Sequence, residues 1–260
     1  MIHTITTSDG CDIAYRLSGQ AEAPVLLLLH SLGASMDMWA PQVEVLGDRF
    51  RLLRPDARGH GRSDAPAGDY TLPRLGEDVL ELLTALAIPR AHVCGLSMGG
   101  MVAMWLAVHA ARHVDRLVLS NTAAWMGPPA AWEERMSLVR AHGMAAVTEP
   151  TLARWFTPAF HARAPAAIEP VRQTLLATEP AGYLGCCAAL RDMDQRPTLA
   201  TITAPTLVIV GEADPSTPPA LGEAIHAAIA GSRLVSLPAA HLANFEQAGT
   251  YNATLAAFLQ

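Results

Sequence analysis

The sequence has few of the features that mark secreted, membrane-bound or nucleic-acid-binding proteins. It begins MIHTITTSDG, without the basic start and apolar run of a secretory signal. Its longest purely apolar runs, such as VLLLL at 25–29, are too short to cross a bilayer. Charged residues make up only 16% of the 260 residues and are scattered, so no basic patch is available for nucleic acid. We expect a soluble cytoplasmic protein that binds neither nucleic acid nor membrane.

Cysteine is also scarce, and the four cysteines have no spacing typical of a metal site or a disulfide framework. No C-x-x-C occurs, and the adjacent Cys186 and Cys187 are badly placed to form a disulfide with each other or to share a zinc ion. His109 and His113 are four residues apart, but no HExxH glutamate lies between them. We therefore expect no metal and free, mostly buried thiols.

About half of the residues are hydrophobic, and their pattern predicts an α/β fold. The first eighteen residues read as a hairpin that turns at Asp9-Gly10. Short apolar runs then alternate with helix-like stretches, of which 73–87 and 99–112 are the clearest. The runs are VLLLLH (25–30), FRLLRPD (50–56), AHVCGL (91–96), RLVLSNT (116–122), TLVIVG (206–211) and RLVSLP (233–238). Continuous apolar runs of this length favour a parallel sheet that is buried on both faces.

The alternation stops between Asn121 and about Ala200. That stretch contains three of the five tryptophans, several prolines and helix-like pieces, but no convincing strand. The pattern resumes at TLVIVG. We predict an α/β core formed by residues 1–122 and 201–260, interrupted by a helical cap at 123–200.

The stretch HVCGLSMGGM (92–101) contains a G-x-S-x-G match centred on Ser97, between a predicted strand and a predicted helix. Ser97 has two interpretations. It could be an ordinary helix N-cap, or a nucleophile presented on a tight turn that small neighbours make possible. The strand–turn–helix context favours the nucleophile.

A serine nucleophile needs a base and an acid that orients the base. In this architecture both should follow the serine, the acid first, in loops after late strands. His241 lies just after the last strand, whereas His226 belongs to an amphipathic helix, so we predict His241 as the base. Asp214 follows TLVIVG directly and is the predicted acid, with Glu212 in reserve.

The oxyanion should be bound by two backbone N–H groups. One belongs to Met98, which follows the nucleophile, and the other we assign to Leu32 in the loop HSLG (30–33) after an early strand. His30 is predicted to be structural. The glycines of RGHGRS (58–63) lack a Walker lysine and a suitable following helix, so we interpret them as a turn and not as a phosphate loop.

Taken together, the motifs resemble the α/β-hydrolase superfamily across the whole chain. The matching stretches are GLSMGG, DARGHGRS at 56–63 and the late Asp214 and His241. The resemblance implies an eight-stranded, mostly parallel sheet flanked by helices, with an α-helical cap insertion. Ser31 departs from the superfamily, because a glycine commonly follows the histidine of this oxyanion loop.

A closer likeness is to 3-oxoadipate enol-lactonases of the bacterial β-ketoadipate route for aromatic compounds. It rests on HSLGASMDMW, FRLLRPDARGHGRSDAP, CGLSMGGM, LSNTAAWMGPP and especially AGYLGCCAALRDMD. The likeness implies hydrolysis of 3-oxoadipate enol-lactone to 3-oxoadipate without a cofactor, with Ser97, Asp214 and His241 in the matching positions. A decarboxylase domain is fused to the related enzyme in some bacteria, and we expect none here because the chain ends just after its last predicted helix.

Such a substrate carries a carboxylate, so a cation should meet it. We predict Arg191 in the cap for this role, with Arg154 as the alternative, and Trp125 and Trp155 as walls of the pocket. Three other functions stay open: a general carboxylesterase or perhydrolase, a C–C bond hydrolase, and a ligand-sensing protein of the same fold.

Overall fold

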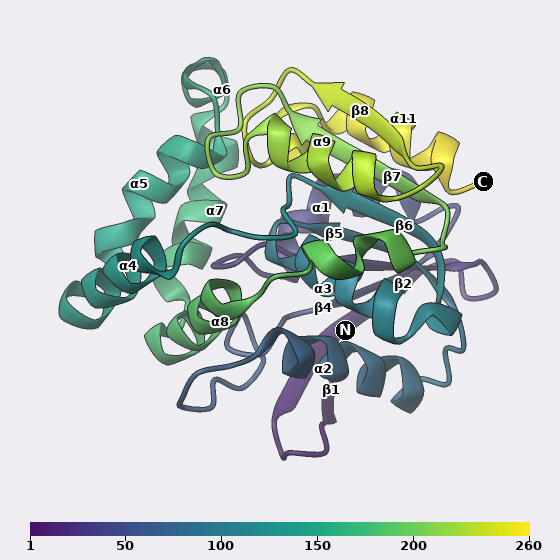
Figure 1. The fold of residues 1–260 in the computed structure, drawn as a ribbon, viewed down its shortest axis with the longest axis horizontal. Coiled ribbons are helices and arrows are strands. Elements are labelled where there is room, and N and C mark those ends of the chain that lie inside the picture. Colours follow the sequence, from purple (N-terminus) through teal and green to yellow (C-terminus); the bar gives the residue numbers. More distant parts are fainter.

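The computed structural model describes residues 1–260, and its centre is one eight-stranded β-sheet (Figure 1). The strands are β1 (His3–Thr6), β2 (Asp12–Gly19), β3 (Val25–Leu29), β4 (Arg51–Pro55), β5 (Ala91–Leu96), β6 (Val114–Ser120), β7 (Thr206–Gly211) and β8 (Arg233–Leu237). Their order across the sheet is β1-β2-β4-β3-β5-β6-β7-β8. The pairs β1–β2 and β2–β4 are antiparallel, and all other neighbours are parallel. The predicted hairpin and the predicted mostly parallel sheet are confirmed.

The sheet is covered on both faces, which explains why its central strands are apolar without alternation. In β3, Leu27 and Leu29 pack into one cluster of buried residues, whereas Leu26 and Leu28 pack into another. The first cluster includes the faces of α2 (Leu72–Ala85), α3 (Met98–His109) and α9 (Pro219–Ala228). The second includes those of α1 (Ala40–Leu46) and α11 (Ala248–Phe258). Side chains on both faces of each strand are therefore removed from water.

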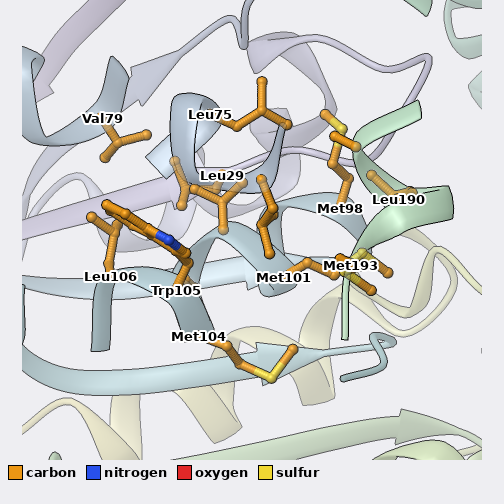
Figure 2. Packing of buried hydrophobic residues seen from close by; sticks show 14 of the residues in the cluster. Leu29, Leu75, Val79, Met98, Met101, Met104, Trp105, Leu106, Leu190 and Met193 are labelled. Carbon is orange, nitrogen blue, oxygen red and sulfur yellow. The ribbon is translucent and has the colours of Figure 1, made fainter. Parts of the chain in front are cut away.

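Helix α3 is apolar all round because it lies between the sheet and α2. Figure 2 shows Met98, Met101, Trp105 and Leu106 of α3 among Leu29 of the sheet and Leu75 and Val79 of α2. Gly76 lets the two helices approach, since a Cβ there would lie 2.0 Å from the Trp105 ring. Thr71 begins α2 as an N-cap, because its hydroxyl accepts the N–H of Arg74.

We use the term cap segment for residues 123–200, which contain five helices and no strand of the sheet. The helices are α4 (Pro129–His142), α5 (Ala145–Trp155), α6 (Pro158–Arg163), α7 (Pro165–Ala177) and α8 (Pro180–Asp192), followed by the 3-10 turn η3 (Arg196–Thr201). In Figure 1 these helices gather at the left of the view, beside the sheet. The three remaining short helices are η1 (Met36–Trp39), η2 (Ala111–His113) and α10 (Ala243–Glu246).

Glycines bring the cap segment close to the core. The backbone of Gly182 in α8 passes so near Gly59 that a Cβ on Gly59 would lie 2.5 Å from the Gly182 Cα. Gly185 accepts the N–H of Tyr70 through its carbonyl, at 3.0 Å. Cys186 and Cys187 follow on the same helix and are fully buried. All four cysteines are free and buried, as predicted. No helix of the structure combines the length and apolar character needed to span a membrane.

Candidate active site

Four polar residues stand where four neighbouring parallel strands end. Ser97 follows β5, Asn121 follows β6, Asp214 follows β7 and His241 follows β8. The carboxyl ends of parallel strands lie at one edge of the sheet, and the strand order reverses beside β5, at β3. Ligands of open α/β sheets bind in the crevice at such a point. The topology therefore brings together residues that are up to 144 positions apart in the chain.

Ser97 sits in a strained backbone conformation, with φ 57° and ψ −118°. A non-glycine residue rarely adopts such a positive φ, and it persists only where the surroundings enforce it. Gly95 and Gly99 make the sharp turn possible. A Cβ on Gly95 would lie 2.1 Å from the Gly99 carbonyl oxygen, and one on Gly99 would lie 2.1 Å from the Leu29 oxygen. The Ser97 hydroxyl does not cap α3, so the N-cap interpretation is wrong.

Asp214 and His241 form a buried pair. The Nδ1 atom of His241 lies 2.8 Å from Oδ2 of Asp214, and both side chains are almost fully buried. The same oxygen accepts hydrogen bonds from the Thr217 hydroxyl at 2.7 Å and from the Asn121 amide at 3.0 Å. Its partner Oδ1 accepts the backbone N–H groups of Ser216 and Thr217. The carboxylate is therefore held on both oxygens.

This environment decides the protonation of the pair. Burial alone would raise the pKa of Asp214, but the charge and hydrogen bond of His241, with the donors from Thr217 and Asn121, outweigh burial and lower the pKa to about 2. An ionised carboxylate only accepts hydrogen bonds, so Nδ1 of His241 carries a proton. In the neutral imidazole, Nε2 is then left as the basic atom.

Ser97 and His241 share the wall of one cavity, which has a volume of about 270 Å³. The core contributes Ser31, Leu32, Ser97, Pro215, Ser216, Thr217 and His241, and the cap segment contributes Met126, Ala131, Trp132, Arg135, Thr151, Arg154, Trp155, Tyr183 and Leu190. The Trp155 ring lies beside His241, with 6.2 Å between the ring centroids. The cavity thus lies between the sheet edge and the cap segment.

Two arginines of the cap segment reach this cavity without a carboxylate partner. Arg154 donates only to the Thr151 hydroxyl, at 3.3 Å, and Arg135 lies 5.2 Å from the centroid of the Trp132 ring. Neither forms an ion pair, although the chain has many. Burial, and then the like charge of Arg135, lower the pKa of Arg154. Two unpaired positive charges beside each other favour an anionic ligand.

The loop 30–33, in which Leu32 was predicted to bind an oxyanion, is held by two buried histidines. His60 accepts the Gly33 N–H at Nε2, at 2.8 Å, and lies near the Arg58 carbonyl through Nδ1. His30 accepts the Ala57 N–H at Nε2 and contacts the Ser31 carbonyl through Nδ1. Burial lowers the pKa of His30 to about 4 and that of His60 to about 3, so both rings are neutral. These bonds interlock the loop 30–33 with the turn 56–61, as the structural interpretations of His30 and RGHGRS predict.

Leu32 lies between these anchored residues and lines the cavity. Its backbone N–H donates to no other group of the chain. Met98 begins α3, where the first N–H groups have no partner within the helix. The Ser31 N–H in the same loop donates to the Met38 sulfur at 3.3 Å. The backbone N–H groups of Leu32 and Met98, which were predicted to bind an oxyanion, thus have no acceptor within the loop or the helix to which they belong.

The family comparison agrees with this architecture. The family model described as alpha/beta hydrolase fold matches residues 24–248, most of the chain. The chain belongs to the α/β-hydrolase family. The predicted fold class and superfamily are therefore confirmed, and the protein is a hydrolase.

Similar proteins narrow the position of this α/β hydrolase within the family. It is 38% identical over 257 residues to 3-oxoadipate enol-lactonase 2 of Acinetobacter baylyi, an alignment that covers 99% of this chain and 96% of the relative. The enol-lactonase of Burkholderia xenovorans LB400 is 40% identical, with a TM-score of 0.97 and 99% of both chains covered. A hydrolase from Pseudomonas aeruginosa PA01 is 49% identical, also with a TM-score of 0.97, over 99% of this chain and 98% of that one. The predicted resemblance to enol-lactonases is confirmed.

Two of the predicted binding residues of this hydrolase lie outside the cavity. The Arg191 guanidinium is engaged by Asp69, Glu133 and Asp192, which join α8 to α4 and to the loop before α2. Trp125 is covered by the Arg196 guanidinium, 4.2 Å from its ring centroid. Neither lines the cavity, whereas Trp155 and the alternative Arg154 do. Three carboxylates already neutralise Arg191, whereas Arg154 lines the cavity without a carboxylate partner.

Sequence reasoning did not find Asn121, Thr217, Arg135 or Tyr183. Asn121 had a signal, since it is the polar residue that directly follows the strand within the run RLVLSNT, at the same sheet edge as Ser97. It adopts a φ of 44°, which turns its amide toward Asp214 and the Ala240 carbonyl. Thr217 is three residues after Asp214, a spacing typical of a side chain that caps a turn. Arg135 and Tyr183 had no signal, because only the packing of α4 and α8 aims them at the cavity.

Proposed function

We propose that this hydrolase opens 3-oxoadipate enol-lactone to 3-oxoadipate in the breakdown of aromatic compounds. The observation that carries the proposal is the single cavity that has Ser97 and His241 at the sheet edge and two unpaired arginines in the cap segment. A small lactone with a carboxylate has the two groups that such a cavity would bind. The similarity to enol-lactonases over nearly the full length supports the same substrate.

In the proposed reaction, Ser97 Oγ attacks the lactone carbonyl while Nε2 of His241 takes the hydroxyl proton. Asp214 stabilises the imidazolium that forms. The ring C–O bond then breaks and expels an enolate, an easier leaving group than an alkoxide. Its protonation gives the 3-oxo group, and water activated by His241 cleaves the acyl-enzyme. One water is consumed, and no cofactor or metal is required.

The negative charge on the attacked carbonyl oxygen would be met by the backbone N–H groups of Leu32 and Met98. Their lack of acceptors within the chain supports this role. Loss of one such donor typically costs 10²–10³ in kcat in serine hydrolases, roughly 3–4 kcal/mol. A backbone donor cannot be removed by substitution, so the interlocked loops that hold it matter more than the side chains of Leu32 and Met98.

The substrate carboxylate would be bound by Arg154, with Arg135 beside it. A charge-assisted hydrogen bond contributes about 1.5–3 kcal/mol, enough to favour an anionic lactone over a neutral ester. Trp155 forms part of the apolar wall. In this proposal, residues 123–200 act as a cap that supplies specificity, residues 1–122 and 201–260 supply the chemistry, and the protein works in the cytoplasm.

The decisive measurement follows the ultraviolet loss of 3-oxoadipate enol-lactone, generated in situ, with wild type and Ser97→Ala. Turnover of p-nitrophenyl acetate is measured alongside. Fast lactone opening that disappears in Ser97→Ala, with slow ester hydrolysis, is the expected result. Brisk ester hydrolysis with a sluggish lactone would retain Ser97 as nucleophile but replace the lactonase by a general carboxylesterase. Equal activity of Ser97→Ala would remove Ser97 from the mechanism.

A further inference from the structure

Glu246 is a buried carboxylate near His241 that the proposed mechanism does not use. It ends the short helix α10, five residues after His241, and only 6% of its surface is exposed. No arginine, lysine or histidine forms an ion pair with its carboxylate. Burying a carboxylate without a counter-ion is costly unless hydrogen bonds satisfy both oxygens. The donors that meet it therefore indicate what it does.

Those donors come from two separate parts of the molecule. Oε2 accepts the backbone N–H of Ala240, the residue before His241. Oε1 accepts the Thr157 N–H at 2.8 Å and the Thr157 hydroxyl at 2.7 Å. Thr157 belongs to the cap segment, between α5 and α6. One oxygen thus closes the loop 240–246 around His241, and the other joins that loop to the cap segment.

Two further contacts strengthen the same junction. The Leu242 N–H donates to the Trp155 carbonyl at 3.0 Å, and Arg163 donates to the backbone carbonyl of Glu246 at 2.9 Å. Trp155 lines the cavity and its ring lies beside His241. The histidine and the cap wall that faces it are therefore parts of one hydrogen-bonded unit.

We propose that Glu246 is a positioning residue that holds the His241 loop in register with Ser97 and fastens it to the cap wall at Thr157. The proposal rests on the roles given above to Ser97 and His241. Only a carboxylate can accept on both sides, since an amide of the same size has one acceptor oxygen and its NH₂ group would face a donor. Replacement by glutamine keeps the packing and breaks the junction on one side.

The test uses the rate at which a fluorophosphonate labels Ser97. This rate reports the activation of the serine by its base and does not depend on which ester or lactone is the natural substrate. We expect Glu246→Gln to slow labelling 10- to 100-fold and to lower kcat for p-nitrophenyl acetate by a similar factor, with KM within threefold. Thr157→Val removes one of the three hydrogen bonds and should slow labelling two- to fivefold. Thr157→Ser keeps the hydroxyl and should label like wild type.

The pH profile separates positioning from a loss of stability. With an aligned base, labelling reaches a plateau as the pH rises, whereas hydroxide-driven labelling continues to rise toward pH 10. Glu246→Gln should have a shorter plateau than wild type, because hydroxide-driven labelling overtakes the slowed histidine-assisted route at a lower pH, and His241→Ala should have no plateau at all. Thr71→Val is the matched control, because it removes the hydroxyl that caps α2, and Thr71 does not line the cavity. It should lower the melting temperature as Thr157→Val does, and keep the wild-type rate and plateau.

Wild-type rates and an intact plateau in folded Glu246→Gln would overturn the proposal. If Glu246→Gln does not fold, an unchanged rate in Thr157→Val has the same meaning. Slow labelling with a plateau that extends to the same pH as in wild type would also overturn it, since that result indicates a smaller folded fraction and not a misplaced base. Failure of the wild type to label at Ser97 would instead remove the catalytic roles themselves, whatever Glu246 does.

Discussion

The two walls of the cavity are built on opposite principles. At the sheet edge, every oxygen and nitrogen of the Asp214–His241 pair except the basic Nε2 has a partner within the chain, and Ser97 is fixed by a strained turn. In the cap wall, Arg135 and Arg154 have no carboxylate partner, although Arg191, on the same cap segment, has three. In the proposed function, the wall with Asp214 and His241 performs the chemistry, and the wall with Arg135 and Arg154 binds the anionic part of the substrate.

The largest effect is expected from removing His241, the proposed base, from the wall at the sheet edge. We expect His241→Ala to lower kcat by roughly 10⁵–10⁶, because a serine hydroxyl is a poor nucleophile without a base. Steady-state kinetics with the enol-lactone measure this. KM should change little, since the imidazole contributes to the transition state more than to binding. A loss of less than tenfold would contradict the assignment.

Asp214→Asn should have a smaller effect and leave roughly 10- to 100-fold more activity than His241→Ala. The amide cannot accept from His241, Thr217 and Asn121 together, so the imidazole loses its orientation while Nε2 survives. Comparison of kcat for both variants in one assay tests this order. Activity of Asp214→Asn below that of His241→Ala would show that the carboxylate has a further role.

Removing charge from the wall with Arg135 and Arg154 should change binding and not chemistry. We expect Arg154→Gln to raise KM for the anionic lactone roughly 10- to 100-fold, the equivalent of a charge-assisted hydrogen bond, with kcat nearly unchanged. Hydrolysis of the neutral p-nitrophenyl acetate should not change.

Arg191→Gln is the matched control for Arg154→Gln, the same substitution on the same cap segment. It should affect lactone KM less than threefold, because its charge is already neutralised by Asp69, Glu133 and Asp192. A larger effect of Arg191→Gln than of Arg154→Gln would reverse our assignment of the carboxylate site.

The smallest expected effect concerns His30 and His60, which hold the loop 30–33 and the turn 56–61. It is a change in the free energy of unfolding with pH. His30 and His60 have folded pKa values of about 4 and about 3, below the unfolded value of about 6.5. Between pH 6.5 and pH 4 the unfolded chain binds protons that the folded chain does not, so stability falls as the pH is lowered. The loss is at most about 1.4 kcal/mol per pH unit for each histidine.

Urea unfolding of wild type and His60→Gln at pH 6.5, 5.5 and 5.0 checks this expectation. The variant should start less stable, because glutamine fills the site poorly, but its stability should fall less steeply with acid by the contribution of one histidine. If the free energy of unfolding falls equally with acid in both proteins, the pKa of His60 is not lowered by folding, and the expectation is wrong.

Much of the core and little of the cap segment could be predicted. The runs VLLLLH, AHVCGL and TLVIVG form β3, β5 and β7. They could be recognised because a strand that is buried on both faces is apolar throughout, whichever residues pack against it. That Ser97, Asp214 and His241 share one edge of the sheet could be predicted for a related reason, since each follows a parallel strand and the carboxyl ends of parallel strands lie together. In the cap segment, helices could be recognised but their mutual packing could not, so Trp125 and Arg191 were expected in a cavity that they do not line.

By itself the sequence determined which segments become strands of the sheet and that a tight turn presents Ser97. It also determined that Ser97, Asp214 and His241 follow strands at one edge of the sheet. These depend on local patterns, on glycines beside one serine and on apolar runs that must be buried. Only the tertiary structure decided which arginine is free and which carboxylate holds the His241 loop. Whether a guanidinium is neutralised depends on residues far away in the chain, as with Arg191 and Asp69, 122 positions apart. Electrostatic balance of this kind exists only after the chain has folded.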